Sequence, residues 1–143
     1  MYYFAYGSNM NHEQMRQRCP SARFFKSGYL EGYKFVYDGY SKKRNGAVAN
    51  VVLSKGGRVW GGLFEINADN LAALDCYEGC PQAYQREEKN VKDNEDKIIQ
   101  TYVYLRAEES LGKPSKEYKD VILQGAEDCM LPEEYRQFLT KYY

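Results

Sequence analysis

Short apolar runs separated by glycine-rich or charged segments fill the first half of the chain, and this pattern predicts strands. Residues 2–6 are all aromatic or small and predict a buried strand. Residues 7–9 (Gly-Ser-Asn) are typical of turns and helix caps. Residues 11–18 are polar, with Met10 and Met15 as the main apolar contacts, and predict a short surface helix.

The next sixty residues predict further strands. Alternating aromatics over residues 24–40, interrupted by two glycines, predict two strands with a bend or bulge between them. The basic segment 41–46 is expected to be a solvated loop rather than a binding patch. Residues 47–53 form an apolar run of strand length, and residues 58–66 are expected to return as its hairpin partner after a glycine turn at 55–57.

The second half of the chain mixes helices with strands. A helix capped by Asn67 or Asp69 is predicted to reach about residue 77 and to end at Gly79. Weak, charged alternation over residues 84–92 predicts an edge or half-exposed strand. The remaining predictions are a turn at 93–96, a clear strand at 98–105, a helix at 115–128 and a second helix from Pro132 onward.

These elements predict one α+β domain over residues 1–143, because the sequence contains no repeat, low-complexity tract or linker. Six or seven strands, joined mostly by hairpins, favour a mixed sheet that curls toward a small barrel with flanking helices. The 15 tyrosines supply apolar area together with hydroxyl groups, which suits a polar-lined pocket or barrel interior.

Composition excludes several classes of function. Lys and Arg together number 20, as do Asp and Glu, and the charges are interspersed, which argues against a nucleic-acid binder. No apolar run approaches the roughly 18 residues of a membrane span. Met1 leads into the first strand without a signal segment, so we expect a cytoplasmic protein with four reduced cysteines. Cys76 and Cys80 lack a second ligand pair, so we expect no metal.

Candidate catalytic groups are few. The sequence contains no nucleophile elbow, phosphate loop or dinucleotide fingerprint, and its single histidine, His12, falls on the predicted surface helix, where we expect it to be exposed. Glu78 lies at the C-terminal end of a predicted helix, where the helix dipole and partial burial both raise a carboxyl pKa toward the range useful for proton transfer. The residues alone also fit an exposed glutamate in the last helical turn.

The turn at residues 7–9 is a second candidate, because a strand, a tight turn and a helix start leave several backbone N–H groups without partners. Such a turn can seat a carboxylate or an oxyanion. Many turns of this kind bind nothing.

Several segments together resemble the γ-glutamylcyclotransferase family, and the resemblance covers most of the chain. They are Phe4-Ala5-Tyr6-Gly7-Ser8-Asn9, Val59-Trp60-Gly61, Leu74-Asp75-Cys76-Tyr77-Glu78-Gly79, Tyr84, and the tail from Lys113-Pro114 through Tyr118 to Leu131-Pro132. The family's architecture agrees with the predicted curled sheet. The resemblance implies an enzyme that converts a γ-glutamyl amide to 5-oxoproline and a free amine or amino acid, without a cofactor.

The resemblance also implies roles for particular residues. Glu78 would be the general acid/base, and Asp75 would have no catalytic role. Tyr118 would contact the substrate and Tyr84 would line the pocket. We further hypothesise that the backbone of Tyr6, Gly7, Ser8 and Asn9 supplies hydrogen-bond donors to the substrate, with Tyr3, Phe4 and Ala5 as the adjacent wall.

Alternatives remain at this stage. The leaving group can be an amino acid, favoured by Asn9 and the Leu131-Pro132 tail, or an amine, and a pathway-specific γ-glutamyl-removing enzyme is also compatible. A glutathione-specific enzyme is expected to differ just after Tyr-Gly-Ser. A non-catalytic binding module of the same fold is the alternative of another class. We expect a small-molecule γ-glutamyl partner, no nucleic acid and no membrane, in a monomer or homodimer.

Overall fold

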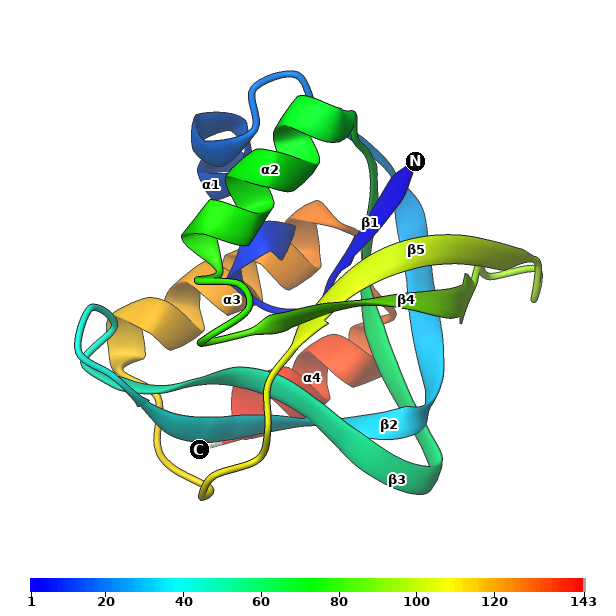
Figure 1. Cartoon of the computed structure of the whole chain (residues 1–143). Coiled ribbons are helices and arrows are strands. Elements are labelled where there is room, and N and C mark those ends of the chain that lie inside the picture. Colours follow the sequence, from blue (N-terminus) through cyan, green and yellow to red (C-terminus); the bar gives the residue numbers. More distant parts are fainter. Residues whose placement is uncertain (143) are drawn as a thin grey trace.

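A closed barrel of five strands organises the fold in the computed structural model, which describes residues 1–142 (Figure 1). The strands follow the order β1-β3-β2-β4-β5 around the barrel. The elements along the chain are β1 (Tyr2–Ala5), a short 3-10 helix η1 (Ser8–Met10), α1 (His12–Arg18), β2 (Arg23–Ser41), β3 (Gly46–Glu65), α2 (Ala68–Tyr77), β4 (Gln85–Lys92), β5 (Ile98–Leu105), α3 (Lys116–Asp128) and α4 (Glu133–Lys141). The predicted α+β class with a curled, mixed sheet is confirmed.

The predicted strand count is wrong, because two pairs of predicted strands are single long strands. Residues 23–41 form one strand, β2, and residues 46–65 form its antiparallel partner, β3. The expected hairpin turn at 55–57 lies inside β3, at a register shift opposite Gly32 of β2. Gly32 and Gly56 both have positive φ, +82° and +80°, so these glycines bend the paired strands together instead of reversing the chain.

The barrel is mixed because β1 is antiparallel to β3 and parallel to β5. β4 pairs with β5 along its length and meets β2 at Tyr29 opposite Lys92. The half-exposed character expected of this strand is confirmed by its mostly exposed and intermediate positions. The edge of β4 that faces away from β5 is only partly open, because its contact with β2 closes the barrel.

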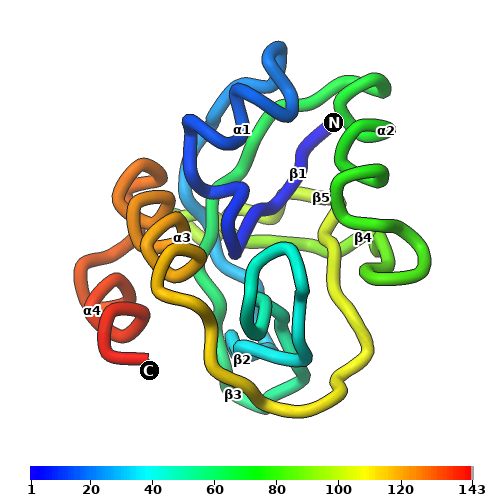
Figure 2. Tube along the Cα trace, turned by 90° about the vertical axis from the view of Figure 1, so that its left-hand side faces the viewer, coloured from blue at the N-terminus to red at the C-terminus, as the bar shows by residue number. Residues whose placement is uncertain are grey.

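Four helices cover the barrel, and they begin where the sequence predicts. Asn67 and Asn70 form a reciprocal capping box at the start of α2, and Gly79 follows its end with φ +62°. Ser115 caps α3 by accepting a hydrogen bond from the Tyr118 backbone N–H. Figure 2 shows α3 and α4 side by side on one flank, with α1 and α2 at the upper end of the molecule. None of the helices within residues 1–142 is both long and apolar enough to cross a membrane.

Helix α3 approaches η1 closely at Gly125. A Cβ atom added there would lie 2.5 Å from the backbone nitrogen of Asn11 and 2.7 Å from the carbonyl carbon of Met10. Both are backbone atoms, so α3 itself would have to move away. The missing side chain therefore sets the distance between α3, which carries Tyr118, and the turn that follows β1.

We expect Gly125→Ala to lower the free energy of unfolding. Crowding in a packed interior costs about 1–3 kcal/mol, which exceeds the roughly 1 kcal/mol that alanine gains over glycine in a helix. Thermal unfolding followed by circular dichroism measures the effect, with Gln124→Ala at the neighbouring exposed position as the control. A Gly125→Ala protein as stable as the wild type would show that α3 can shift without cost.

Candidate active site

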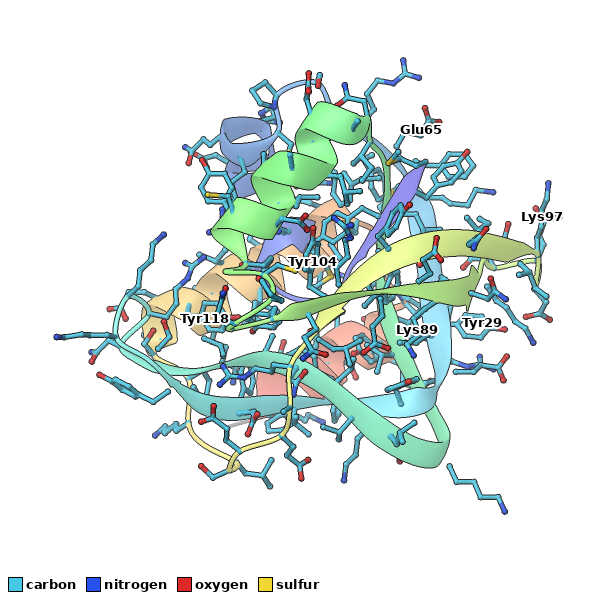
Figure 3. The ribbon with its side chains drawn as sticks, viewed as in Figure 1. Tyr29, Glu65, Lys89, Lys97, Tyr104 and Tyr118 are labelled. Carbon is cyan, nitrogen blue, oxygen red and sulfur yellow. The ribbon has the colours of Figure 1, made fainter. Side chains whose placement is uncertain are left out.

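A pocket at one end of β1 is lined by most of the site residues that were predicted from the sequence. Its lining consists of Tyr3, Tyr6, Gly7, Ser8, Asn9, Ala49, Glu78, Tyr84, Tyr104 and Tyr118. Figure 3 shows Tyr104 and Tyr118 below α2, with Tyr118 toward the β2–β3 loop. Residues more than 100 positions apart in the sequence therefore meet around Glu78.

Two nominated residues are not brought to the pocket. Phe4 is fully buried in the barrel core, and Ala5 is buried beside it. Two lining residues were not nominated. Ala49 and Tyr104 come from β3 and β5, and only the closure of the barrel places them next to Glu78.

Glu78 caps the C-terminal end of α2, and its side chain turns into the pocket. Its backbone N–H donates to the carbonyl of Leu74 at 2.9 Å, which holds the residue on the helix. Burial raises the pKa of the Glu78 carboxyl above its ordinary value of 4.5, and the positive charges of Arg18 and Arg44 offset part of that rise. The pocket therefore contains a carboxylate that holds its proton more tightly than a solvated glutamate does.

Asn9 fixes the position of Glu78. Its side-chain nitrogen donates to Glu78 Oε1 at 3.3 Å and to the hydroxyl of Tyr3 at 3.0 Å. Its side-chain oxygen accepts from Gln14 Nε2 at 2.8 Å and from Arg18 Nη1 at 3.1 Å. The buried amide is satisfied at both ends, so its N–H₂ group is held toward the carboxylate.

Tyrosine hydroxyls line the pocket in fixed positions. Tyr118 accepts a hydrogen bond from the Ala49 backbone N–H at 2.9 Å, whereas Tyr84 donates to the Ala49 carbonyl at 2.6 Å. Tyr6 donates to the carbonyl of Tyr104 at 2.5 Å. Burial raises the pKa of Tyr118 to about 12 and raises those of Tyr6 and Tyr84 as well. All three are therefore neutral phenols near neutral pH.

Two arginines that the sequence analysis did not select contact residues of the pocket lining, Arg18 at Asn9 and Arg44 at Ser8. Arg44 comes from the β2–β3 loop, which was expected to be a solvated tip. Its Nη2 donates to Gln14 Oε1 at 2.9 Å and to Ser8 Oγ at 3.4 Å, and its guanidinium lies 5.0 Å from the Tyr118 ring centroid. The β2–β3 loop therefore places the Arg44 guanidinium next to the pocket lining, as α1 does with Arg18.

Asp75 and His12 lie outside the pocket lining. Asp75 accepts a hydrogen bond from the Tyr104 hydroxyl at 2.6 Å and pairs with Arg86 at 2.5 Å, so it ties α2 to the barrel wall. The expected exposure of His12 is wrong: its ring is half-buried and packs at 4.9 Å from the Phe24 ring centroid. Short polar helices next to a barrel bury one face, and His12 is on that face.

Metal ligands do not gather anywhere in the part of the chain that the structure describes: residues 1–142 contain no group of three or more His, Cys, Asp or Glu side chains placed to hold an ion. The four cysteines are free thiols, with Cys19 and Cys129 buried. The pocket thus offers one half-buried carboxylate, several phenols and the backbone of a tight turn, with two cations next to its lining.

Comparison with known proteins agrees with this picture. The sequence profile of the AIG2-like family matches residues 58–139. Human γ-glutamylcyclotransferase is 36% identical over 142 residues, covering 96% of this chain and 76% of the human protein, and the mouse protein is 35% identical with the same coverage. The chain belongs to the γ-glutamylcyclotransferase family. A solved structure of a γ-glutamyl cyclotransferase superposes with a TM-score of 0.95 at 34% identity, covering 100% of this chain and 88% of that one.

The profile match spans the positions of Glu78, Tyr84 and Tyr118, and the structural match covers the N-terminal turn as well. The resemblance inferred from the sequence motifs is therefore confirmed.

Proposed function

We propose that this protein is a γ-glutamylcyclotransferase that converts a γ-glutamyl amino acid to 5-oxoproline and the free amino acid, with Glu78 as the general acid/base. The observation that carries the proposal is the half-buried Glu78 carboxyl, held by Asn9 in a pocket whose other wall is the turn at Gly7 and Ser8. Family membership supports the reaction, since the relatives carry that activity in their names.

The reaction needs little covalent chemistry from the protein. The substrate's α-amine attacks its own γ-carbonyl carbon, a five-membered ring closes, and the bond from that carbon to the leaving nitrogen breaks. The α-ammonium nitrogen starts with three protons and the lactam nitrogen keeps one, so two protons leave it, one before the attack and one as the ring closes. The departing nitrogen takes up one of them as its bond to carbon breaks, and the other makes the released amine an ammonium group. A single carboxylate beside both nitrogens can accept a proton from the attacking nitrogen and return it to the departing nitrogen. Holding the chain in a folded, near-attack form supplies much of the remaining rate enhancement.

The raised pKa of Glu78 suits this exchange. A carboxyl that binds its proton more tightly than ordinary is a stronger base for the ammonium proton. Asn9 keeps it oriented through the bond to Oε1, and the second carboxylate oxygen remains for the substrate. The arrangement also argues against a purely binding module, because a carboxyl is costly to bury.

The remaining groups suit the charges of a γ-glutamyl moiety. The N–H groups at the start of η1 have no partners within that helix and, with the Tyr118 hydroxyl, are proposed to hold the carbonyl oxygen as it gains charge. Arg18 and Arg44 are proposed to attract the substrate's α-carboxylate. The pocket volume of about 40 Å³ accommodates about three water molecules, so the pocket must widen when the substrate enters. The Arg44 side chain is held only by neutral groups, and we expect it to move at this step.

Release of 5-oxoproline from γ-glutamyl amino acids and γ-glutamyl amines tests the proposal. We expect turnover of at least one γ-glutamyl amino acid. If no member of a panel spanning small, acidic, aromatic and amine leaving groups yields 5-oxoproline, the proposed activity is wrong.

The pH profile provides a separate prediction. Because the base works when ionised, kcat/KM should rise with pH through the pKa of Glu78, at a pH above the ordinary glutamate value of 4.5. Arg44 lowers that pKa, so Arg44→Gln should move the acid limb to higher pH, whatever it does to substrate affinity. Lys43→Gln, at an exposed position of the same loop, is the control and should leave the limb in place. An unmoved limb in Arg44→Gln would show that another group titrates.

A further inference from the structure

A second hollow adjoins the pocket and shares Glu78 and Tyr84 with it. It is open to solvent and larger, with a volume of about 460 Å³. Its walls come from the end of β2, from the segment after α2, and from the loop that follows β5. In that loop Arg106 and Glu109 line the hollow. A molecule that reaches Glu78 from solvent through this hollow passes Arg106.

Arg106 is held rigidly in this position. The side chain of the buried Asn50 accepts from the Arg106 backbone N–H at 3.0 Å and donates to the Arg106 carbonyl at 2.9 Å. The guanidinium lies 3.8 Å from the buried carboxylate of Asp38 and 5.7 Å from the ring centroid of Tyr84. The Arg106 side chain is only 12% exposed, and its Nε has no hydrogen-bond partner among the described residues.

Two carboxylates face Arg106, the buried one of Asp38 and the exposed one of Glu109. Asp38 is already occupied, because it accepts hydrogen bonds from the backbone N–H groups of Glu109 and Ser110. Glu109 contacts Arg106 Nη2 at 2.8 Å, but its side chain is 63% exposed. An ion pair with one partner largely in water is weak, so another carboxylate can replace Glu109 at little cost.

We propose that the outer hollow receives the leaving amino acid and that Arg106 binds its α-carboxylate, in the place that Glu109 occupies without substrate. The inference rests on the proposed function and specifies its substrate class. In a γ-glutamyl amino acid this carboxylate is two bonds from the nitrogen that Glu78 must protonate, so it belongs in the hollow that begins at Glu78. A fixed guanidinium matches the planar carboxylate, and an amine leaving group offers nothing to bind.

A matched pair of substrates isolates this contact. γ-Glutamyl-L-alanine and γ-glutamyl ethylamide differ only by the carboxylate. In Arg106→Gln we expect kcat/KM for the alanine substrate to fall roughly 10- to 100-fold, the range of a lost hydrogen bond between charged groups, while the ethylamide value is unchanged. Lys43→Gln removes an equal charge from an exposed loop position and should alter neither substrate.

Glu109→Gln provides the second variant, since an exposed side chain can change without disturbing the fold. Freed from its competing carboxylate, Arg106 should bind the alanine substrate more tightly, so KM for that substrate falls while turnover of the ethylamide is unchanged. If Arg106→Gln does not fold, Glu109→Gln still tests whether Arg106 binds the carboxylate of the leaving amino acid.

The outcomes separate the two proposals. Equal loss of both substrates in Arg106→Gln, or an unchanged KM for γ-glutamyl-L-alanine in Glu109→Gln, would overturn the role of Arg106 while the cyclotransferase activity stands. A wild-type protein that forms 5-oxoproline from neither substrate nor from the wider panel would overturn the activity, and the subsite with it.

Discussion

Glu78→Gln should reduce kcat for 5-oxoproline formation roughly 10²- to 10⁴-fold, the range that general acid–base catalysis supplies. Glutamine keeps the size of the side chain and an oxygen that can accept the hydrogen bond from Asn9, so the pocket should keep its shape. It cannot take the proton from the substrate's ammonium group. We expect KM to change little, because the lost interaction belongs to the proton transfer and not to binding.

The same variant carries its own folding control. The pKa of Glu78 is raised in the folded protein, so the folded state binds this proton more tightly than the unfolded state does. Ionised Glu78 therefore destabilises the fold as pH rises through and above its ordinary pKa of 4.5. Glu78→Gln should be at least as stable as the wild type at neutral pH, and the difference should vanish in acid. An inactive but equally stable protein identifies the base, whereas loss of less than about tenfold in kcat would reject the assignment.

Asn9→Ala should reduce kcat about 10²-fold, the cost of a misplaced catalytic group. The substitution removes the donor that holds Glu78 and leaves Gln14 and Arg18 without the oxygen that accepts from them. Because buried partners lose their hydrogen bonds, the free energy of unfolding should also fall, by about 1–3 kcal/mol. Initial rates and thermal unfolding measure the two effects.

Asn94→Ala, at an exposed turn, is the matched control and should alter neither the rate nor the stability. The decisive comparison is the acid limb of the kcat/KM profile. In Asn9→Ala it should move, since the environment of Glu78 changes, whereas a purely structural loss would lower the rate at every pH alike. A stable Asn9→Ala protein with the wild-type rate would show that Glu78 needs no support from Asn9.

Motifs with local signals were predictable from the sequence. Glu78 and the turn at residues 7–9 each combine a local feature with the family resemblance, and the structure brings them to one pocket. The helix cap at Asn67 and the helix start near Ser115 follow from side chains that satisfy nearby N–H groups, so short windows of sequence suffice.

Features that depend on distant contacts were not predictable. Arg44 has the sequence context of a solvated loop, and only the length and bend of the β2–β3 pair carry it to Ser8. Gly56 has the local chemistry of a hairpin turn, but the neighbouring strand decides whether such a glycine reverses the chain or bends it. Arg106 likewise has no motif, because Asp38 and Asn50 reach it from other strands.

The position of β1 has a consequence for the order of folding. This strand of four residues lies between β3 and β5, and its partners in these strands are separated from it by about two fifths and about two thirds of the chain. The β2–β3 hairpin needs no such distant partner and can form from adjacent segments. Strand pairs between remote segments form slowly. We therefore expect amides of β2 and β3 to become protected from hydrogen exchange first during refolding, and the turn at residues 7–9 after β1 to be ordered among the last.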